Sequence, residues 1–187
     1  MHYIECRTCL QTVAKIKFSD YKDQILALRK KVWEQTDPSL MKQLFVNGFY
    51  DEHDETAFHW GVFDDEKLIA SARLSKHYLI ETLPDFHLLE DIKKPDINFP
   101  IASLNRLVID KEFQGNGLST AFDKVRIAKA KLINCQSICG MTYGKRGNKL
   151  LSEGFNVYHS LKLSKGFVSD KESAKNIPPA FYYKELK

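Results

Sequence analysis

The sequence predicts one α/β domain, residues 1–187, in which helices flank a mixed, mostly antiparallel sheet of about seven strands. Three observations support this fold class. Strand-like and helix-like segments follow one another along the whole chain. The 187 residues, of which 43% are hydrophobic, suffice for one domain with a full core. The sequence contains no internal repeat, low-complexity run or linker that would divide it.

The first elements are a strand and two helices. Residues 12–19 alternate apolar and polar side chains, as a half-buried strand does. Ser19 or Asp20 is a suitable N-cap for the helix that follows. The apolar residues of this helix recur at helical spacing: Ile25, Leu28, Val32 and Trp33. Asp37-Pro38 ends or kinks the helix, and we expect a short second helix that runs to Val46.

The middle of the chain predicts a hairpin, an irregular segment and another strand. Residues 57–64 and 67–77 are strand-like and are joined by a turn of acidic residues, so we expect them to pair in an antiparallel hairpin. Residues 79–100 contain several prolines and are expected to be irregular. Residues 102–110 form the next strand.

The C-terminal part predicts two helices and three strands. Residues 118–132 carry apolar side chains at helical spacing, and residues 137–144 form a strand. A short helix over residues 147–154 is closed by Gly154 at its C′ position. The last two strands, joined by a polar loop, cover residues 155–163 and 180–186.

Composition excludes several classes of protein. The net charge of +4 is a mild excess without a basic stripe of interleaved aromatic residues, so we expect no nucleic-acid partner. No stretch reaches the ~18 apolar residues of a membrane span. Residues 1–10 lack the charged start, apolar run and cleavage site of a signal peptide. We therefore expect a cytoplasmic protein without a membrane span.

The four cysteines allow two interpretations. Cys6 with Cys9, and Cys135 with Cys139, have the spacing of two halves of a zinc site. The favoured alternative is that Cys135 and Cys139, at the start of a predicted strand, are small buried hydrophobic residues. No neighbouring histidine completes either half, so we expect no metal.

Residues 105–125 pass from an apolar strand through Gly115 and Gly117 into a helix. Such a turn leaves the first N–H groups of the helix free, and these groups and the positive end of the helix dipole bind anions. Glycine admits a phosphate close to the backbone, and Ser119 and Thr120 add hydroxyl donors. We therefore predict a pyrophosphate site made by Gln114, Gly115, Asn116, Gly117, Leu118, Ser119 and Thr120.

Two common phosphate motifs do not fit this turn. A P-loop requires lysine and then serine or threonine after its last glycine, whereas Leu118 follows Gly117. A dinucleotide-binding turn requires a third glycine where Thr120 stands, and lies early in its βαβ unit rather than past the middle of the chain.

The stretch resembles the acyl-CoA pyrophosphate loop of the GNAT superfamily of N-acyltransferases. Its pattern, Arg/Gln-x-x-Gly-x-Gly/Ala after a Leu-x-Val strand, is occupied here by Gln114, Gly117 and Ser119 after Leu107 and Ile109. Ser119 departs from Gly/Ala but is small. The order of elements and the Gly-Phe pair at residues 154–155 also resemble this superfamily.

The resemblance implies a GNAT fold whose sheet is splayed between its fourth and fifth strands, where an acyl-CoA thioester would lie. Backbone N–H groups near Leu107 and Val108 would hold the thioester oxygen. Ile109 would pair with the pantetheine arm. The implied donor is acetyl-CoA or another acyl-CoA, and the acceptor is the amine of a small molecule.

The N-terminal half also resembles one branch of the superfamily, which includes acyl-homoserine lactone synthases and N-acyl amino acid synthases. The matching positions are Arg29, Trp33, Asp51, Asp54, Arg73 and Arg106. They are candidates for acceptor binding. The alternative is structural: the two aspartates cap a short turn, and the arginines pair with them as salt bridges.

The usual proton carriers of the superfamily are missing. Ser103 occupies the slot of the glutamate base, and Leu150 that of the tyrosine acid. Tyr143 is the candidate acid; its alternative is a packed aromatic residue at a strand end. His59 is expected to be a packed strand residue rather than a base. Tyr158 and His159 are neighbours on a strand near the C-terminus, so one of their two side chains faces inward.

Three functions remain open. The first is transfer of an acetyl or short acyl group to a small amine. The second is transfer of a longer chain, from acyl-CoA or acyl carrier protein, to an amino-acid-like acceptor, with Phe45, Phe49 and Phe99 lining or blocking the tunnel that a long chain needs. The third is a non-catalytic acyl-CoA sensor, which the missing proton carriers favour. An exposed last strand makes a homodimer a hypothesis.

Overall fold

A seven-stranded sheet in the order β1-β2-β3-β4-β5-β7-β6 runs through the part of the chain that the structure describes. The structure is a computed structural model; it describes residues 12–36, 49–84, 86, 97–142, 144–160 and 180–186, and of residues 158–160 the backbone alone. The strands are β1 Ala14–Ile16, β2 Phe58–Asp64, β3 Lys67–His77, β4 Ile101–Ile109, β5 Ser137–Thr142, β6 Asn156–Ser160 and β7 Ala180–Glu185. Neighbouring strands are antiparallel except β4 and β5, which are parallel. The predicted mixed, mostly antiparallel sheet is confirmed.

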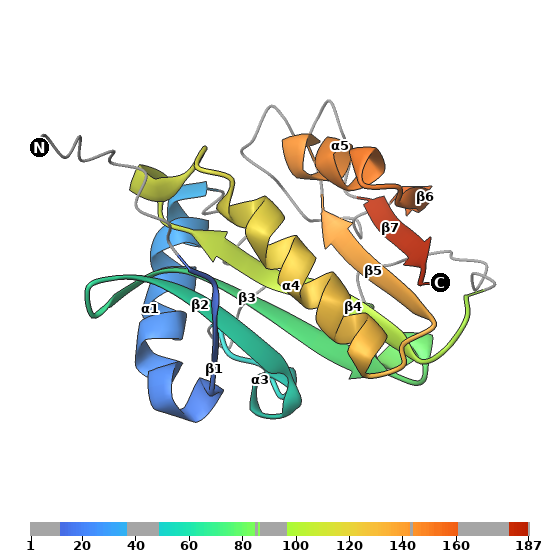
Figure 1. Cartoon of the computed structure of the whole chain (residues 1–187), viewed down its shortest axis with the longest axis horizontal. Coiled ribbons are helices and arrows are strands. Elements are labelled where there is room, and N and C mark those ends of the chain that lie inside the picture. The colour runs from blue at the N-terminus through green and yellow to red at the C-terminus, as the bar shows by residue number, and fades with distance from the viewer. Residues whose placement is uncertain are drawn as a thin grey trace, which may run out of the picture.

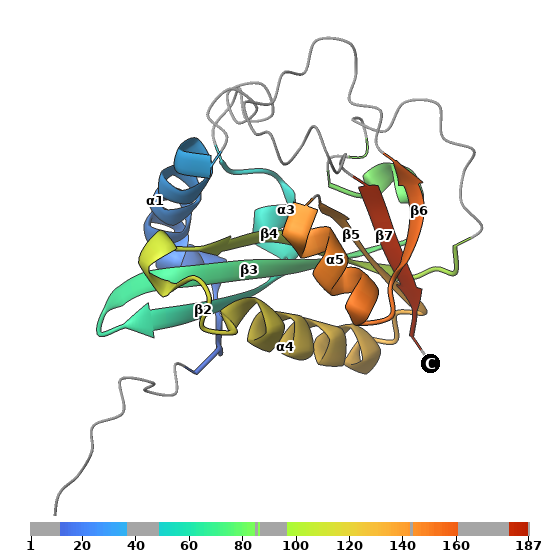
Figure 2. The same cartoon turned by 90° about the horizontal axis from the view of Figure 1, so that it is seen from above.

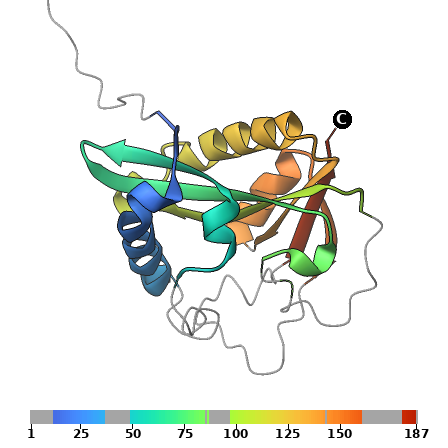
Figure 3. The same ribbon diagram turned by 90° about the horizontal axis from the view of Figure 1, so that it is seen from below.

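Helices cover both faces of this sheet (Figures 1 and 2). They are α1 Phe18–Thr36, α3 His53–Thr56, α4 Leu118–Leu132 and α5 Gly144–Ser152, with short 3-10 helices Ile80–Thr82 and Lys111–Phe113. In Figure 3, α1 (blue), α3 (teal) and the 3-10 helix Ile80–Thr82 (green) lie on one side of the sheet and α4 (gold) on the other. In the described part of the chain, no helix is both long and apolar enough to cross a membrane.

The first strand is shorter than predicted and the first helix begins earlier. β1 ends at Ile16, and α1 begins at Phe18 rather than after an N-cap at Ser19 or Asp20. Phe18 is buried because its ring packs 5.1 Å from that of His59, which draws the start of the helix onto the sheet. Tyr21, with φ −127°, interrupts the helical backbone soon afterwards.

The remaining predicted elements lie where the sequence placed them, with two differences. The hairpin of β2 and β3 and the helix Leu118–Leu132 agree with the prediction. α5 begins at Gly144, three residues before its predicted start, and Gly154 with φ +82° follows its end. α3 was not predicted as a helix, and the expected helix up to Val46 lies outside the described residues.

Two apolar clusters fix the helices on the sheet. On one face, Phe122 of α4 and Leu150 of α5 pack with the apolar side chains of β2 to β5 and β7. On the other face, Ile25, Leu28 and Val32 of α1 pack on Val108. Burial of such side chains contributes roughly 1.5–3 kcal/mol each. The sheet is therefore held from both faces, and β3 and β4 lie at its centre.

Candidate functional site

β4 and β5 separate after a short stretch of pairing. Residues 101–103 of β4 pair in parallel with residues 137–139 of β5, and no further pair follows, although β4 continues to Ile109 and β5 to Thr142. Figure 1 shows the two strands diverging from their paired ends. The predicted splay between the fourth and fifth strands is confirmed, and among the described residues no strand pairs with the second half of β4 on that side.

The other side of β4 carries a β-bulge. Arg73 of β3 lies opposite Asn105, but Ser71 lies opposite Val108, so Arg106 and Leu107 together face one residue of β3. Arg106 has φ +52°, the left-handed conformation that a non-glycine residue adopts rarely and at a cost in energy. An extra residue in one strand reverses which backbone groups face each neighbour beyond that point.

The hydrogen-bond ladder shows the result. Just beyond the end of β4, the N–H of Asp110 donates to the carbonyl of Ile69 on β3, 2.9 Å away. In an antiparallel ladder, hydrogen-bonded and non-hydrogen-bonded residue pairs alternate. Because Asp110 belongs to a hydrogen-bonded pair, Val108, two residues earlier, also turns its N–H toward its partner Ser71 of β3. Leu107 and Ile109 turn theirs the other way, toward the gap beside β5. Both Leu107 and Val108 stay candidates near the thioester, and the register favours Leu107 as the residue whose N–H faces the gap.

The predicted glycine turn lies between the end of β4 and the start of α4. Gly115 has φ +86° and Gly117, the N-cap of α4, has φ +76°. A Cβ added at either position would meet no atom within 4 Å, so the space beside both glycines is open. No side chain caps α4, and its first turn contains no acidic residue. The turn therefore offers N–H groups of the first turn of α4 and the positive end of its helix dipole to an anion; of these groups, that of Thr120 already donates to the carbonyl of Gly117 at 2.9 Å.

Lys149 of α5 extends this cluster of donors, which the sequence did not predict. Its ammonium donates to the hydroxyls of Ser119, 2.9 Å away, and of Thr120. Both hydroxyls accept from the lysine and can therefore donate their own protons outward. Partial burial lowers the pKa of Lys149. In the same turn, Gln114 donates from its side chain to the carbonyl of Ile109, at 3.0 Å.

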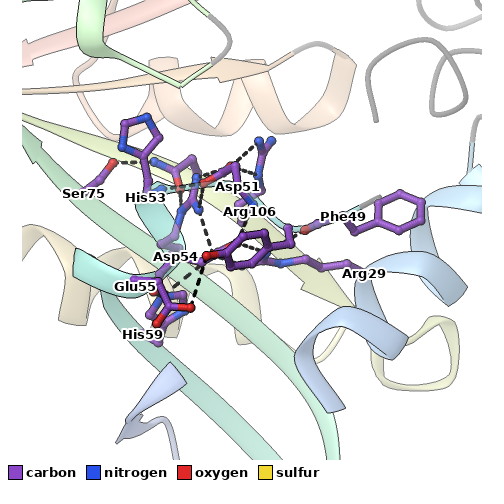
Figure 4. Close-up of polar contacts among 12 residues, drawn as sticks. Arg29, Phe49, Asp51, His53, Asp54, Glu55, His59, Ser75 and Arg106 are labelled. Atoms are coloured by element: carbon purple, nitrogen blue, oxygen red, sulfur yellow. Dashed lines mark hydrogen bonds and ion pairs between the residues drawn. The ribbon is translucent and has the colours of Figure 1, made fainter. Parts of the chain in front are cut away.

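The arginines and aspartates that were predicted as candidates for acceptor binding form one network, which joins α1 and α3 to β3 and β4 (Figure 4). Arg29 of α1 makes two hydrogen bonds of 2.7 Å to Asp54 of α3. Arg73 of β3 donates to both aspartates: 2.7 Å to Asp54, and 2.5 and 2.9 Å to Asp51. Arg106 of the bulge donates to Asp51 at 2.6 and 3.1 Å. Arginines and aspartates thus alternate from α1 to β4.

Burial divides this network into two parts. The side chains of Arg29, Asp54 and Arg73 are at most 1% exposed, whereas those of Arg106 and Asp51 are 8% and 24% exposed. Burial acts to raise the pKa of Asp51, but hydrogen bonds and charges of the arginines outweigh it and hold that pKa below its usual range. Only the Asp51–Arg106 end of the network reaches the surface.

Trp33 and the backbone of α3 complete this end. The guanidinium carbon of Arg106 lies 5.8 Å from the centre of the Trp33 ring, within cation–π range. The Asp51 carboxylate accepts from the N–H of His53 at 3.0 Å, and its carbonyl accepts from the N–H of Asp54 at 3.0 Å. The structural interpretation of the two aspartates predicts these contacts, because in it the aspartates cap a turn and pair with arginines.

A chain of hydrogen bonds continues from Arg73 along the sheet. Its Nε donates to Asn105, whose amide donates to Ser75 at 2.9 Å. Ser75 contacts Nε2 of His77 at 2.7 Å, and Nδ1 of His77 contacts Thr82 at 3.0 Å. The Thr82 hydroxyl donates to a backbone carbonyl at 2.8 Å, so it accepts from Nδ1–H. Nδ1 of His77 therefore carries a proton, and in the neutral ring Nε2 accepts the Ser75 proton.

We expect the stability of the protein to fall between pH 7 and pH 5. Burial, with His53 and Arg73 nearby, lowers the pKa of His77 to about 4. The unfolded chain, with a pKa near ~6.5, binds this proton first, so the stabilisation is complete above pH 6.5 and disappears as pH falls toward 4. The loss at pH 5 is on the order of 2 kcal/mol.

Urea unfolding at pH 7 and pH 5 measures this effect, and His77→Gln should lose clearly less stability than the wild type over this range. His59, whose pKa burial also lowers to about 4, keeps part of the dependence in both proteins. Equal losses in the two proteins would show that His77 is not the group responsible.

The candidate proton carrier Tyr143 lies outside the described residues, and the two slots of the usual carriers are occupied by buried residues. The side chains of Tyr158 and His159 also lie outside the described part of the chain. Leu150 is 1% exposed and belongs to the apolar core. Ser103 is buried and accepts from the Asn105 amide at 3.2 Å.

His59 and the cysteines have ordinary surroundings. His59 is buried on β2, with Nε2 2.9 Å from the carbonyl of Asp54. Cys135 and Cys139 are buried and free, and burial raises the pKa of Cys139 to about 12, which keeps it a thiol. Cys6 and Cys9 lie outside the described residues. Among residues that are described, no group of three or more His, Cys, Asp and Glu could hold a metal ion.

Several solved structures have a fold similar to that of this chain. An acetyltransferase of the GNAT family from Streptococcus agalactiae 2603 is 16% identical, with 94% of this chain and 95% of that chain covered and a TM-score of 0.59. An N-acetyltransferase from Staphylococcus aureus Mu50 is 12% identical, with 94% and 98% covered and a TM-score of 0.58. The chain has the GNAT fold. The GNAT fold, which the glycine turn and the order of elements led us to expect, is therefore confirmed.

A third protein of similar fold was solved with ligands. N-acetylglutamate synthase from Neisseria gonorrhoeae, complexed with coenzyme A and N-acetyl-glutamate, is 15% identical with a TM-score of 0.56. The alignment covers 94% of this chain and 35% of that one. No family sequence model and no curated protein sequence matches the chain. At such identities the likeness to solved GNAT structures is one of fold.

Proposed function

We propose that this GNAT-fold chain, as one domain over residues 1–187, is an acyl-CoA-dependent N-acyltransferase. The observation that supports this most is that two features able to bind acyl-CoA, the gap beside β5 and the glycine turn, lie together at one end of β4. By the register of the sheet, the backbone groups of Leu107 and Ile109 face the gap beside β5, and the glycine turn at the N-terminus of α4 follows directly. A thioester and a pyrophosphate belong to one molecule in acyl-CoA, and these features would bind both parts.

Each part of the site has a separate role in this proposal. The turn from Gln114 to Thr120 binds the pyrophosphate with backbone N–H groups and the hydroxyls of Ser119 and Thr120. Ile109 pairs with the amides of the pantetheine arm. The N–H of Leu107 donates to the thioester oxygen as it becomes an oxyanion. The neutral acceptor amine attacks the carbonyl carbon, the C–S bond breaks, and the amine's proton leaves for solvent or the thiolate. Tyr143 remains the candidate acid.

The proposed acyl group is acetyl, and the acceptor is a small amine. An amino-acid-like acceptor with a longer acyl chain, from acyl-CoA or acyl carrier protein, is favoured by one observation: the Asp51–Arg106 end of the ion-pair network reaches the surface beside Trp33. The ring of Phe49 packs 5.6 Å from Trp33, while Phe99 packs in another cluster and Phe45 lies outside the described residues. Cytoplasmic location and a homodimer stay predictions.

Thermal unfolding with CoA, acetyl-CoA and an acyl-CoA of medium chain length tests the proposal. A ligand at ~100 times its dissociation constant adds about 2.7 kcal/mol. At roughly 2–4 °C per kcal/mol, the midpoint should rise by about 5–10 °C. The largest shift identifies the acyl length.

A panel of amines then separates an enzyme from a sensor, because an enzyme releases CoA thiol faster with at least one amine than without any. Shifts without turnover on any amine would favour the sensor. No shift with any of the three ligands would remove the acyl-CoA site.

A further inference from the structure

Arg126 of α4 is a fully buried cation at the centre of the molecule. Its relative exposure is 0%, among the lowest of the described residues. Burial lowers its pKa to about 10, and the guanidinium remains charged at neutral pH. It donates to the carboxylate of Asp123 at 2.7 Å, which Arg146 of α5 also binds through two hydrogen bonds of 2.6 Å. A buried cation of this kind requires partners for all its donors.

The Nε of Arg126 donates to the carbonyl of Phe122 in its own helix at 3.3 Å, and its Nη1 reaches across to the sheet. Its Nη1 lies 3.2 Å from the carbonyl oxygen of Arg73 on β3 and 3.4 Å from that of Asn105 on β4. Arg73 and Asn105 are the last regular pair before the bulge. One guanidinium group therefore bridges the two strands at the position where their regular pairing stops.

Side chains hold the same place from the opposite face. Arg73 donates from Nε to the side chain of Asn105, and Asp51 binds both Arg73 and Arg106. Ion pairs from the α1 side thus hold Arg106, the left-handed residue of the bulge. From the α4 side, Arg126 holds the carbonyls of Arg73 and Asn105, the residue pair next to the bulge. An apolar residue at position 126 would fill the space, but these carbonyls would lose a charged donor.

We propose that Arg126 is a positioning residue of the acyl-transfer site: by binding the carbonyls of Arg73 and Asn105 it holds the bulge that turns the N–H of Leu107 into the gap. This inference rests on the proposed function for its catalytic consequence. Arg126 lies on the helix whose N-terminal turn is the proposed pyrophosphate site, so the same helix would set the place of the cofactor and the direction of the donor.

Two variants separate this role from packing. Arg126→Lys keeps a charge, but its single nitrogen cannot stand both at the position of Nη2, which binds Asp123, and at that of Nη1, which binds the two carbonyls. Arg126→Met tests the apolar replacement, with Asp123 still paired to Arg146. The matched control is Arg146→Met, which removes the other arginine of Asp123 and leaves both carbonyl contacts intact. Circular dichroism and urea unfolding identify the variants that fold.

The first readout is the ¹⁵N–¹H spectrum of the ligand-free protein. The amide resonances of residues 105–108 should shift in Arg126→Lys and stay in place in Arg146→Met. The second is the carbonyl resonance of [1-¹³C]acetyl-CoA, which should move downfield on binding to the wild type and return at least halfway to its free position in Arg126→Lys. Turnover with an accepted amine should fall about tenfold or more, with the dissociation constant of acetyl-CoA nearly unchanged.

The two proposals fail in different ways. If folded Arg126→Lys leaves the amide resonances, the carbonyl resonance and turnover as in the wild type, Arg126 does not position the bulge. If Arg126→Lys does not fold, the same readouts on Arg126→Met decide. If wild-type protein does not bind acetyl-CoA, the proposed function fails instead, and the amide resonances still decide whether Arg126 holds the bulge.

Discussion

Replacing Asp54 by alanine is expected to destabilise the protein by about 3–5 kcal/mol, the usual cost of breaking a buried ion pair from one side. Asp54 is 0% exposed and accepts hydrogen bonds from Arg29 and Arg73, which are themselves buried. Alanine would leave two guanidinium groups without this carboxylate in a region closed to water. The loss is a large part of the 5–15 kcal/mol by which native proteins are usually stable.

Urea unfolding at pH 7 measures this loss, and Glu55→Ala is the matched control in the same helix. The Glu55 side chain is 52% exposed and lies 3.8 Å from Lys22, so its removal should cost no more than about 1 kcal/mol. Asp54→Asn keeps the shape and removes the charge, and should fall between the two. A loss near that of Glu55→Ala would show that the network contributes little to stability.

Gly117→Val is expected to weaken binding of acyl-CoA by about 10- to 100-fold, the equivalent of one or two charge-assisted hydrogen bonds. A Cβ at this position would meet no protein atom within 4 Å, so the side chain fits the free protein but stands where the phosphates would approach the N–H groups. Gly117 also has φ +76°, so valine adds backbone strain of about 1–3 kcal/mol.

Gly154→Val separates strain from the loss of the site. Gly154 has φ +82° and lies beyond the end of α5, where an added Cβ would meet the flexible end of Lys184 at 3.3 Å. Both variants should be destabilised to a similar extent, but only Gly117→Val should lose affinity in calorimetric titration with acetyl-CoA. Equal affinities for Gly117→Val and the wild type would place the pyrophosphate elsewhere.

Local sequence was sufficient for the strands, the long helices and the glycine turn. Strand-like segments on either side of an acidic turn predicted β2 and β3, and the apolar spacing of residues 118–132 predicted α4. The glycine turn was predictable because glycine spacing after a strand reflects a local need for left-handed backbone, which Gly115 and Gly117 adopt. The start of α1 was predicted less well, because contacts of Phe18 with distant residues moved it.

Three features of the site came from tertiary structure alone. The bulge at Arg106 arises from a mismatch between two strands, and neither strand by itself encodes it. It favours Leu107 over Val108 as the residue whose N–H faces the gap. Lys149 and Arg126 were missed because each is one cation on an ordinary helix until packing brings it to residues 30 and 53 positions away.

The sequence by itself determined the class of fold and the place of the glycine turn that we propose as the anion site, because both depend on short-range patterns: burial periodicity and backbone freedom. Tertiary structure decided which strand register directs the backbone donors, which charges reach the surface, and which cation contacts the two strands beside the bulge. These depend on strand register and on contacts between residues far apart in the chain, and no local pattern records them.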